Sequence, residues 1–377
     1  MKILHTSDWH LGKRLPPFSR EDEQREILRE IAGIAREEKV DVTIIAGDVF
    51  DVSVPPATAE EMFYAAASEL AKSCLVVAIA GNHDDGERLK APDVLAKVSG
   101  IILAGGFDCT ALSCSPVTGG KVEGRAGGIV FEKDGEKLNL LLCPYLTEAR
   151  KGDPPAPDFA AYVEKILKER AMSVFSDDGA NITVAHLFML GSSTLGEERE
   201  LGSAKLLPLS VLPKCDYTAL GHVHKPMKLS ENVRYCGSIL GYSFDAADVQ
   251  RRVIIYDTVT KEIKEVPLGC GRKLVTARVG SFDEALAALE QAGDNFVKIV
   301  YDSPVPLTAS KTSELERAGK LALLEIVPQG IKREIKRRAH RSAEELFTEF
   351  YGVRSGGEKP SESLVREFLE LVGEENI

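Results

Sequence analysis

Over the first 190 residues, apolar segments of strand length alternate with segments whose apolar residues recur at helical spacing. No other sequence feature constrains the fold as strongly. The apolar segments lie at residues 2–6, 40–46, 75–80, 138–142 and 182–185. Helical spacing is clearest around residues 27–35, 62–70 and 159–167. Such alternation is typical of an α/β fold with a substantially parallel sheet.

After about residue 215 helical segments become rare, and we predict strands at 217–220, 233–236, 253–256 and 263–266. A βαβαβ pattern then follows, with strands at 274–279, 297–301 and 321–327 and helices at 282–292 and 312–318. We therefore expect mixed sheets flanked by helices in residues 1–270. A small α/β domain should occupy residues 271–341.

The end of the chain is first basic and then apolar at helical spacing. Basic residues cluster between Lys332 and Arg341, which usually marks a solvated face, with DNA contact as the alternative. Ser342 and Glu345 have the spacing of a capping box that opens a helix. A linker of residues 352–360 precedes a last helix from residue 361 to about residue 373. We expect C-terminal helices in residues 342–377.

Charge and hydropathy exclude several classes of protein. The chain has 47 basic and 58 acidic residues and a formal net charge of −11, which argues against coating nucleic acid through bulk charge. An enzyme that meets nucleic acid through bound cations or a basic partner remains compatible with this charge. No apolar segment approaches the roughly 18 residues of a membrane span, and the N-terminal residues turn polar too early for a signal peptide. We therefore expect a cytoplasmic protein.

Two kinds of site are also disfavoured. The seven cysteines are odd in number and lack C-x-x-C spacing, so buried free thiols are expected rather than disulfides or a zinc site. The sequence has no G-x-x-x-x-G-K-[ST] motif, and we expect no nucleotide to be bound by this chain.

Polar residues of metal-binding type follow five of the predicted strands. In chain order they are Asp8 and His10, Asp48, Asn82 and His83, His186, and His222 and His224. Ligand sites of open α/β sheets form beyond the carboxyl ends of the strands, so these side chains should meet at one edge. Five of the chain's seven histidines lie in these positions. Histidines that only fill the core would have no reason to gather after strands.

This set mixes oxygen and nitrogen donors without sulfur, as first-row divalent metals prefer. Eight candidate positions are too many for one ion of four to six ligands, so two ions are the simpler interpretation. Two ions roughly 3.5–4 Å apart need a bridging carboxylate, and Asp48, in the central loop, is the natural bridge.

The motifs Asp8-Trp9-His10, Gly47 to Asp51, Gly81 to Asp84, His186 and Gly221 to His224 resemble those of the calcineurin-like metallophosphoesterases. The segments 3–12, 233–238 and 242–244 resemble, more narrowly, the SbcD family, the bacterial branch of the meiotic-recombination-eleven nucleases. The similarity extends over essentially the whole chain.

The resemblance implies a role for each site residue. One metal would lie on Asp8, His10, Asp48 and His224, and a second on Asp48, Asn82, His186 and His222, with manganese as the expected ion. His83 would act as proton donor or transition-state stabiliser, and Asp51 would orient it. Many relatives carry histidine where this chain has Asp51, so the acid–base arrangement stays open.

The resemblance also implies a function. The chain would be a two-metal DNA exonuclease and endonuclease that acts on ends and hairpins in double-strand-break repair and recombination. Residues 271–341 would cap the site for DNA recognition, and residues 342–377 would dock an SbcC-type coiled-coil ATPase. A homodimer within a heterotetramer is the expected assembly.

Two alternatives are a small-molecule phosphodiesterase or phosphatase of the same superfamily, and a scaffold that has lost the chemistry. The capping region and apolar tail count against the first alternative. The presence of every expected ligand position counts against the second.

Overall fold

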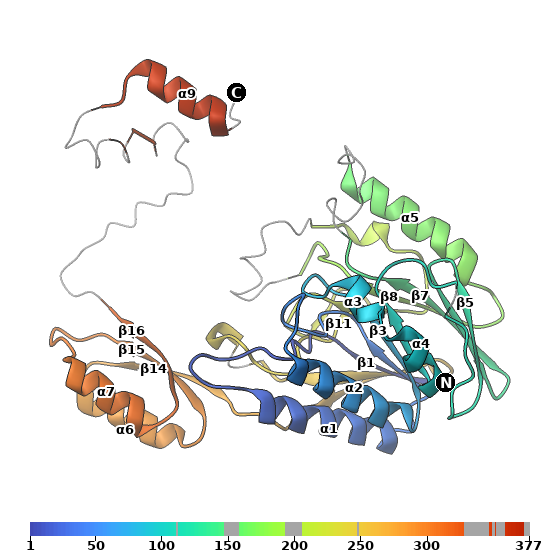
Figure 1. Cartoon of the computed structure of the whole chain (residues 1–377), viewed down its shortest axis with the longest axis horizontal. Helices are drawn as coiled ribbons and strands as arrows, with labels where there is room; N and C mark the ends of the chain where they lie inside the picture. The colour runs from blue at the N-terminus through green and yellow to red at the C-terminus, as the bar shows by residue number, and fades with distance from the viewer. Residues whose placement is uncertain are drawn as a thin grey trace. The chain divides into compact units, whose positions relative to one another are not determined.

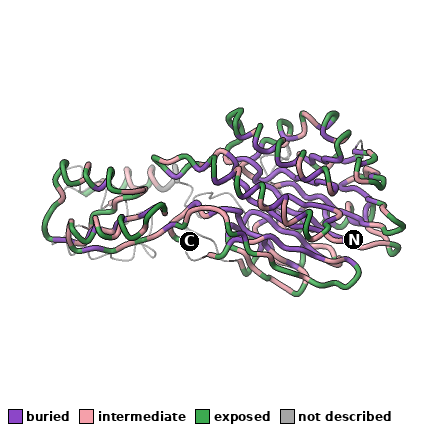
Figure 2. Tube along the Cα trace, turned by 90° about the horizontal axis from the view of Figure 1, so that it is seen from below, coloured by how far each residue is buried: buried purple, intermediate pink, exposed green. Residues whose placement is uncertain are grey.

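The computed structural model describes residues 1–110, 112–146, 158–192, 206–246, 249–327, 347–348, 351 and 359–372 (Figure 1). Residues that are close in space group into two compact units, Met1–Val327 and Pro328–Ile377. The first unit holds all the predicted site residues, and its buried positions concentrate in the strands (Figure 2).

A six-stranded mixed sheet forms the first half of the core. Its order is β13-β12-β1-β2-β3-β4, and β1 to β4 run parallel. Strand β12 is antiparallel to β1, and the edge strand β13 is antiparallel to β12. The strands are β1 Lys2–Thr6, β2 Val42–Ile45, β3 Leu75–Ile79, β4 Ile101–Ala104, β12 Arg252–Asp257 and β13 Ile263–Pro267. Helices α1 (Glu21–Glu37) and α2 (Ala57–Ala71) pack their apolar faces on this sheet.

A seven-stranded sheet, in the order β10-β11-β9-β8-β7-β6-β5, forms the second half. Its strands are β5 Lys121–Arg125, β6 Gly128–Lys133, β7 Glu136–Cys143, β8 Ala180–His186, β9 Tyr217–Gly221, β10 Met227–Lys228 and β11 Val233–Tyr235. Helix α5 (Phe159–Val174) covers its outer face.

The two sheets pack face to face between the helices. In β1, Leu4 faces the α1 and α2 side, whereas its neighbour Ile3 lies in the core that also contains Phe131 and Val184 of the second sheet. This alternation is the side-chain period of a strand buried on both faces. The predicted sandwich of mixed sheets flanked by helices is confirmed.

Residues 274–326 form the predicted βαβαβ unit, hereafter the capping unit. Its three strands are parallel in the order β14-β15-β16, and its helices pack on one face. The elements are β14 Leu274–Val279, α6 Phe282–Ala292, β15 Phe296–Tyr301, α7 Ala309–Ala318 and β16 Leu321–Ile326. It belongs to the same compact unit as residues 1–270, and the boundary at residue 270 stays a prediction.

In the second unit the structure describes α9 (Glu362–Val372), within the predicted last helix. Phe347 stacks on Phe368 of this helix, with ring centroids 4.2 Å apart. The basic stretch of residues 332–341, the capping box at 342–345 and linker residues 352–358 lie outside the described residues. Among the described helices, none combines the length and apolar character that a bilayer crossing requires.

Candidate metal centre

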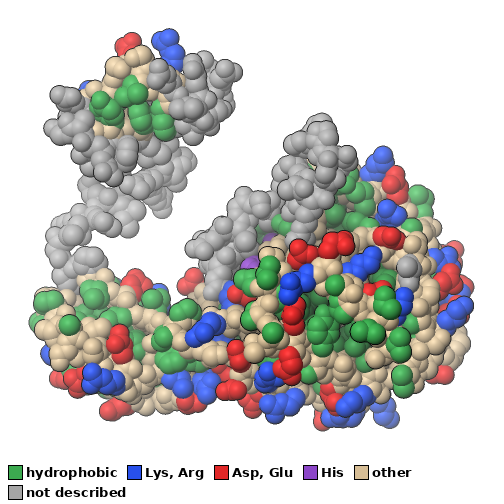
Figure 3. Space-filling view, in the orientation of Figure 1, with side chains coloured by type: hydrophobic (Ala, Val, Ile, Leu, Met, Phe, Trp, Pro, Cys, Tyr) green, Lys and Arg blue, Asp and Glu red, His purple; other side chains and the backbone are tan. Residues whose placement is uncertain are grey.

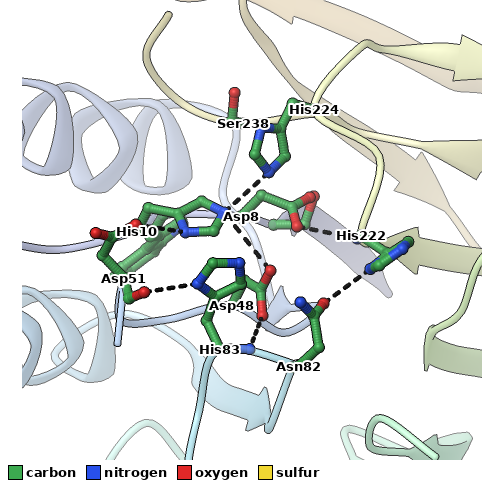
Figure 4. Close-up of polar contacts among 12 residues, drawn as sticks. Asp8, His10, Asp48, Asp51, Asn82, His83, His222, His224 and Ser238 are labelled. Atoms are coloured by element: carbon green, nitrogen blue, oxygen red, sulfur yellow. Dashed lines mark hydrogen bonds and ion pairs between the residues drawn. The ribbon is translucent and has the colours of Figure 1, made fainter. Parts of the chain in front are cut away.

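The predicted site residues meet where strands of both sheets end (Figure 4). Asp8 and His10 follow β1, Asp48 follows β2, and Asn82 and His83 follow β3, while His186 ends β8, and His222 and His224 follow β9. Two clusters of donor atoms result, and they share Asp48.

The first cluster consists of Asp8, His10, Asp48 and His224, whose donor atoms all lie within 4.8 Å of one another. All four residues are buried. His10 Nε2 lies 2.9 Å from His224 Nε2 and 3.5 Å from Asp48 Oδ2. Two imidazole nitrogens that face each other beside a carboxylate form a donor set for a divalent cation.

The second cluster consists of Asn82, His186 and His222 together with Asp48. Asn82 Oδ1 lies 2.9 Å from His186 Nε2 and 2.8 Å from His222 Nδ1. His186 Nε2 is also 3.5 Å from Asp48 Oδ1. The other nitrogen of His186, Nδ1, is 2.9 Å from the carbonyl oxygen of Ala46, which can only accept, so Nδ1 carries a proton and orients the ring.

Asp48 lies between the clusters and turns one oxygen toward each. Its Oδ2 faces His10 in the first cluster, and its Oδ1 faces His186 in the second. Oδ1 also accepts a hydrogen bond from the backbone N–H of His83 at 2.9 Å. A carboxylate in this position can bridge two cations, and the donor types present fit divalent metal ions.

The backbone is strained at four of the candidate ligand residues. Asp8, His10, Asp48 and His222 have φ angles of 52°, 45°, 49° and 100°, where residues other than glycine are uncommon. Such conformations persist where the surrounding structure enforces them, and they cluster at functional sites. Gly81 is required for a steric reason, because a Cβ there would lie 2.1 Å from Asp48 Oδ1.

Burial and neighbouring charges shift the pKa values of Asp48, His186 and His222 in different directions. Burial by itself would raise the pKa of Asp48, but His186 and His10 hold it well below its usual range. Burial by itself would lower the pKa of His186, yet Asp48 and Asp8 raise it to about 9. Burial lowers the pKa of His222 to about 3. In metal-free protein near neutral pH, His186 therefore carries a proton and His222 does not.

Metal binding should consequently release a proton from His186, because an imidazole ligand must be neutral. Since the pKa of His186 is raised to about 9, the release should be about one proton from this residue near pH 7 and about half that at pH 9. Calorimetric titration of metal-free protein in buffers of different ionisation enthalpy measures this number, and His186→Asn is the matched control. Proton release that is the same in the control would assign it to another group.

His83 lies beside the first cluster and is only partly buried. Its ring meets that of His10 edge-on, with centroids 4.7 Å apart, and its Nδ1 is 2.6 Å from the backbone carbonyl oxygen of Asp51. The Asp51 carboxylate instead lies 3.4 Å from His10 Nδ1 and 3.2 Å from Lys13 Nζ. Asp51 thus contacts His83 through its main chain, and the predicted catalytic roles of both residues stay predictions.

His10, Asp51 and His83 also form a group whose donor atoms lie within 4.8 Å of one another. It shares His10 with the first cluster, so a ligand role for His83 is the alternative to a catalytic one. Metal stoichiometry in a His83 variant separates the two roles.

Sequence reasoning did not single out Asp84, which joins two of the ligand loops. Its buried carboxylate accepts hydrogen bonds from the backbone N–H groups of Val49, Phe50 and Gly81 at 3.1, 2.9 and 2.8 Å. It thereby ties the loop after β2 to the loop after β3. Its place directly after His83 in the third motif was the available signal.

Comparison with known proteins shows the family of this chain. The family model described as calcineurin-like phosphoesterase matches residues 1–226, and the chain therefore belongs to the calcineurin-like phosphoesterases. A curated relative, the SbcD component of the SbcCD nuclease of Bacillus subtilis, is 33% identical over an alignment of 401 positions, gaps included, that covers 98% of this chain and 97% of the relative. Within the phosphoesterases, the chain is a member of the SbcD family.

Two further SbcD proteins match shorter parts of the chain. The protein from Rhodobacter capsulatus is 32% identical over an alignment of 256 positions that covers 63% of this chain and 62% of that protein. The protein from Escherichia coli K12 is 29% identical over an alignment of 265 positions that covers 65% of this chain and 62% of that protein. The similarity to the Bacillus subtilis protein also includes the capping unit and the C-terminal region.

Proposed function

We propose that this chain is a metal-dependent DNA nuclease that hydrolyses phosphodiester bonds with two divalent ions, manganese being the expected metal. It would act in the cytoplasm, on DNA ends and hairpins in double-strand-break repair and recombination. The observation that carries the proposal is the position of Asp48, whose two oxygens face two separate donor clusters. Membership of the SbcD family supports DNA as the substrate.

When bound, the ions supply Lewis-acid polarisation of the phosphate and activation of water. The chain's residues have separate roles around them. Asp8, His10 and His224 would hold one ion, Asn82, His186 and His222 would hold the other, and Asp48 would contribute to both sites. His83 protonates the leaving oxygen as a general acid, with its Nδ1 held by the carbonyl of Asp51.

A cleavage assay tests this function and separates it from both alternatives. Metal-free protein is given manganese, magnesium or zinc separately, with linear DNA, hairpin DNA or bis(p-nitrophenyl) phosphate as substrate. The nuclease should cleave DNA only after metal is added, and best with manganese. Cleavage of the small diester without cleavage of DNA would favour the small-molecule phosphodiesterase, and inactivity on all three substrates would favour the scaffold.

A homodimer is the assembly we propose for this chain, as half of a heterotetramer with two ATPase chains. Val94, Leu95 and Val98, in α4 (Asp93–Ala96) and the short helix η1 (Lys97–Ser99), are 68%, 77% and 71% exposed. Neighbouring exposed apolar side chains of this kind support a protein contact. The face drawn in Figure 3, which carries α2 and α4, mixes apolar side chains with charges of both signs.

The C-terminal region should dock an SbcC-type coiled-coil ATPase. Leu364 and Phe368 lie at i, i+4 spacing in α9, and Phe347 stacks on Phe368. Short helices with apolar faces are marginal alone and need a surface to pack against. A helix-in-groove contact with the partner would provide that surface.

A chain that ends at Arg341 should therefore keep manganese-dependent cleavage of single-stranded DNA but fail to co-purify with the ATPase. Phe368→Glu should weaken the same interaction, and Ser363→Glu, on the same helix, is the matched control. Undiminished ATPase binding by the truncated chain would contradict the docking role. An insoluble truncated chain would instead indicate that the tail packs on the protein's own capping unit.

A further inference from the structure

A buried hydrogen-bond network outside the ligand set holds the loop that carries His10. Gln24, in the first turn of α1, is fully buried. Its Oε1 accepts from the backbone N–H of Gly12 at 3.1 Å, and its Nε2 donates to the His10 carbonyl and to the Tyr242 hydroxyl, both at 3.1 Å. The Tyr242 hydroxyl in turn donates to the carbonyl of Trp9 at 2.9 Å. Gln24 and Tyr242 together thus hold the main chain at Trp9, His10 and Gly12.

The loop needs this support because its backbone is strained. Asp8 and His10 both have positive φ angles, and such conformations persist only where neighbouring contacts enforce them. Removing a neighbour should therefore let the loop relax toward ordinary backbone angles. The ligand atoms of Asp8 and His10 would then leave the geometry that the first cluster requires.

The same end of α1 carries a buried charge pair that reaches the capping unit. Arg20 is only 1% exposed, forms an ion pair with Glu23 at 2.5 Å, and donates to the carbonyl of Gly241 at 2.7 Å. Its guanidinium lies 5.0 Å from the ring centroid of Phe296 in β15 and 5.8 Å from that of Tyr242. Arg20 is therefore in contact with the capping unit on one side and with the loop-holding tyrosine on the other.

Further contacts fix the capping unit against Arg20 and Glu23. The backbone N–H of Arg272, which precedes β14, donates to Glu23 Oε1 at 2.6 Å. Phe296 also belongs to a small apolar cluster with Leu15 and Leu274. We call Arg20, Glu23 and Phe296 the cap seat. Removing one member of a buried charged contact is costly, because water or rearrangement must then compensate the remaining charge.

Another buried arginine contacts the main chain of the second histidine in the first cluster. Arg251 is buried and donates to the carbonyl of His224 and to Ser238 Oγ, both at 2.8 Å. Arg251 lines a pocket of about 630 Å³ that is also lined by the segment joining β13 to β14, including Arg272. The main chain of both His10 and His224 is thus tied to the region where the capping unit is attached.

We propose that the cap seat positions the first metal cluster, with Gln24 and Tyr242 as the positioning residues between them. Loss of Phe296 would expose the Arg20–Glu23 pair to water. Arg20 would then no longer pack firmly against the Tyr242 ring, and the loop that carries His10 would loosen as a result. The seating of the capping unit then sets the affinity of the first cluster for its ion. This inference rests on the proposed metal-dependent function.

The test compares full-length Phe296→Ala with Phe282→Ala. Phe282 is partly buried, packs against the capping unit's own core and is not part of the seat, so its variant is the control for loss of one phenylalanine from the same unit. Manganese affinity is measured by electron paramagnetic resonance, and amide hydrogen exchange of residues 7–14 is followed in metal-free protein. Phe296→Ala should weaken binding of the first ion roughly 10-fold, as loss of outer contacts to metal ligands typically does, and should speed exchange at Gly12.

Tyr242→Phe removes only the hydroxyl and keeps the volume, so it remains informative if Phe296→Ala fails to fold. It should weaken the first ion and speed exchange in the same segment while the capping unit's exchange stays unchanged. Values for Phe296→Ala and Tyr242→Phe that equal those of the control would overturn the proposal. If wild-type protein and His10→Ala bind manganese equally, the proposed metal site itself fails, which is a different result.

Discussion

Asp48→Asn should abolish DNA cleavage and weaken the binding of both ions. Asparagine keeps the shape of the side chain, but it removes the negative charge that lies between the clusters and replaces one of the two facing oxygens with an amide nitrogen. Several kcal/mol of charge stabilisation would be lost, which corresponds to a rate decrease of about 10³-fold or more. Elemental analysis of bound metal, alongside the cleavage rate, measures both effects.

The matched control is Asp41→Asn, just before the other end of β2, where the carboxylate accepts a hydrogen bond from the backbone N–H of Lys2. It should leave metal content and cleavage unchanged. An Asp48→Asn protein that keeps two ions per chain would show that Asp48 does not bridge them.

His83→Gln should lose most turnover, about 10²- to 10⁴-fold, the usual contribution of a general acid, while both ions stay bound. The physical reason is that His83 lies beside the first cluster and has its Nδ1 occupied by the carbonyl of Asp51, which leaves Nε2 for the leaving oxygen. Metal stoichiometry and cleavage are measured on the same sample. Loss of one ion would make His83 a ligand in the group with His10 and Asp51.

The leaving group gives a second test of the same role. If His83 protonates the leaving oxygen, the substitution should harm cleavage of DNA much more than cleavage of bis(p-nitrophenyl) phosphate, because p-nitrophenolate needs little protonation to leave. Equal losses on the two substrates would argue that His83 stabilises charge on the phosphate instead.

Long stretches of the fold could be predicted because their patterns are local. The apolar segments at 2–6 and 75–80 form β1 and β3, and the βαβαβ pattern after residue 274 forms the capping unit. Strands β4, β5 and β6 and the two-residue strand β10 were not predicted. Strand β5, Lys121–Arg125, contains one buried apolar residue and a glycine, and it lies at the edge of its sheet, so neither periodicity nor composition marks it.

The site shows the same division. The candidate ligand residues and their order along the chain could be predicted, because each of them lies at or just after the end of a strand that its apolar sequence marks. Asp84 and Gln24 were not readable, because each acts through backbone groups of a distant segment, the first on Val49 and Phe50 and the second on His10. A single sequence carries no record of such contacts.

Local sequence was thus sufficient to predict most of the strands and helices, the candidate metal-binding residues, and the βαβαβ pattern of residues 274–326. Packing between distant segments determined the face-to-face arrangement of the sheets, the positive φ angles of Asp8 and His10, and the turn of the Asp51 carboxylate toward Lys13. It also placed one oxygen of Asp48 in each cluster. Periodicity and turn chemistry act over a few residues, whereas these features depend on the free energy of contacts between residues far apart in the chain.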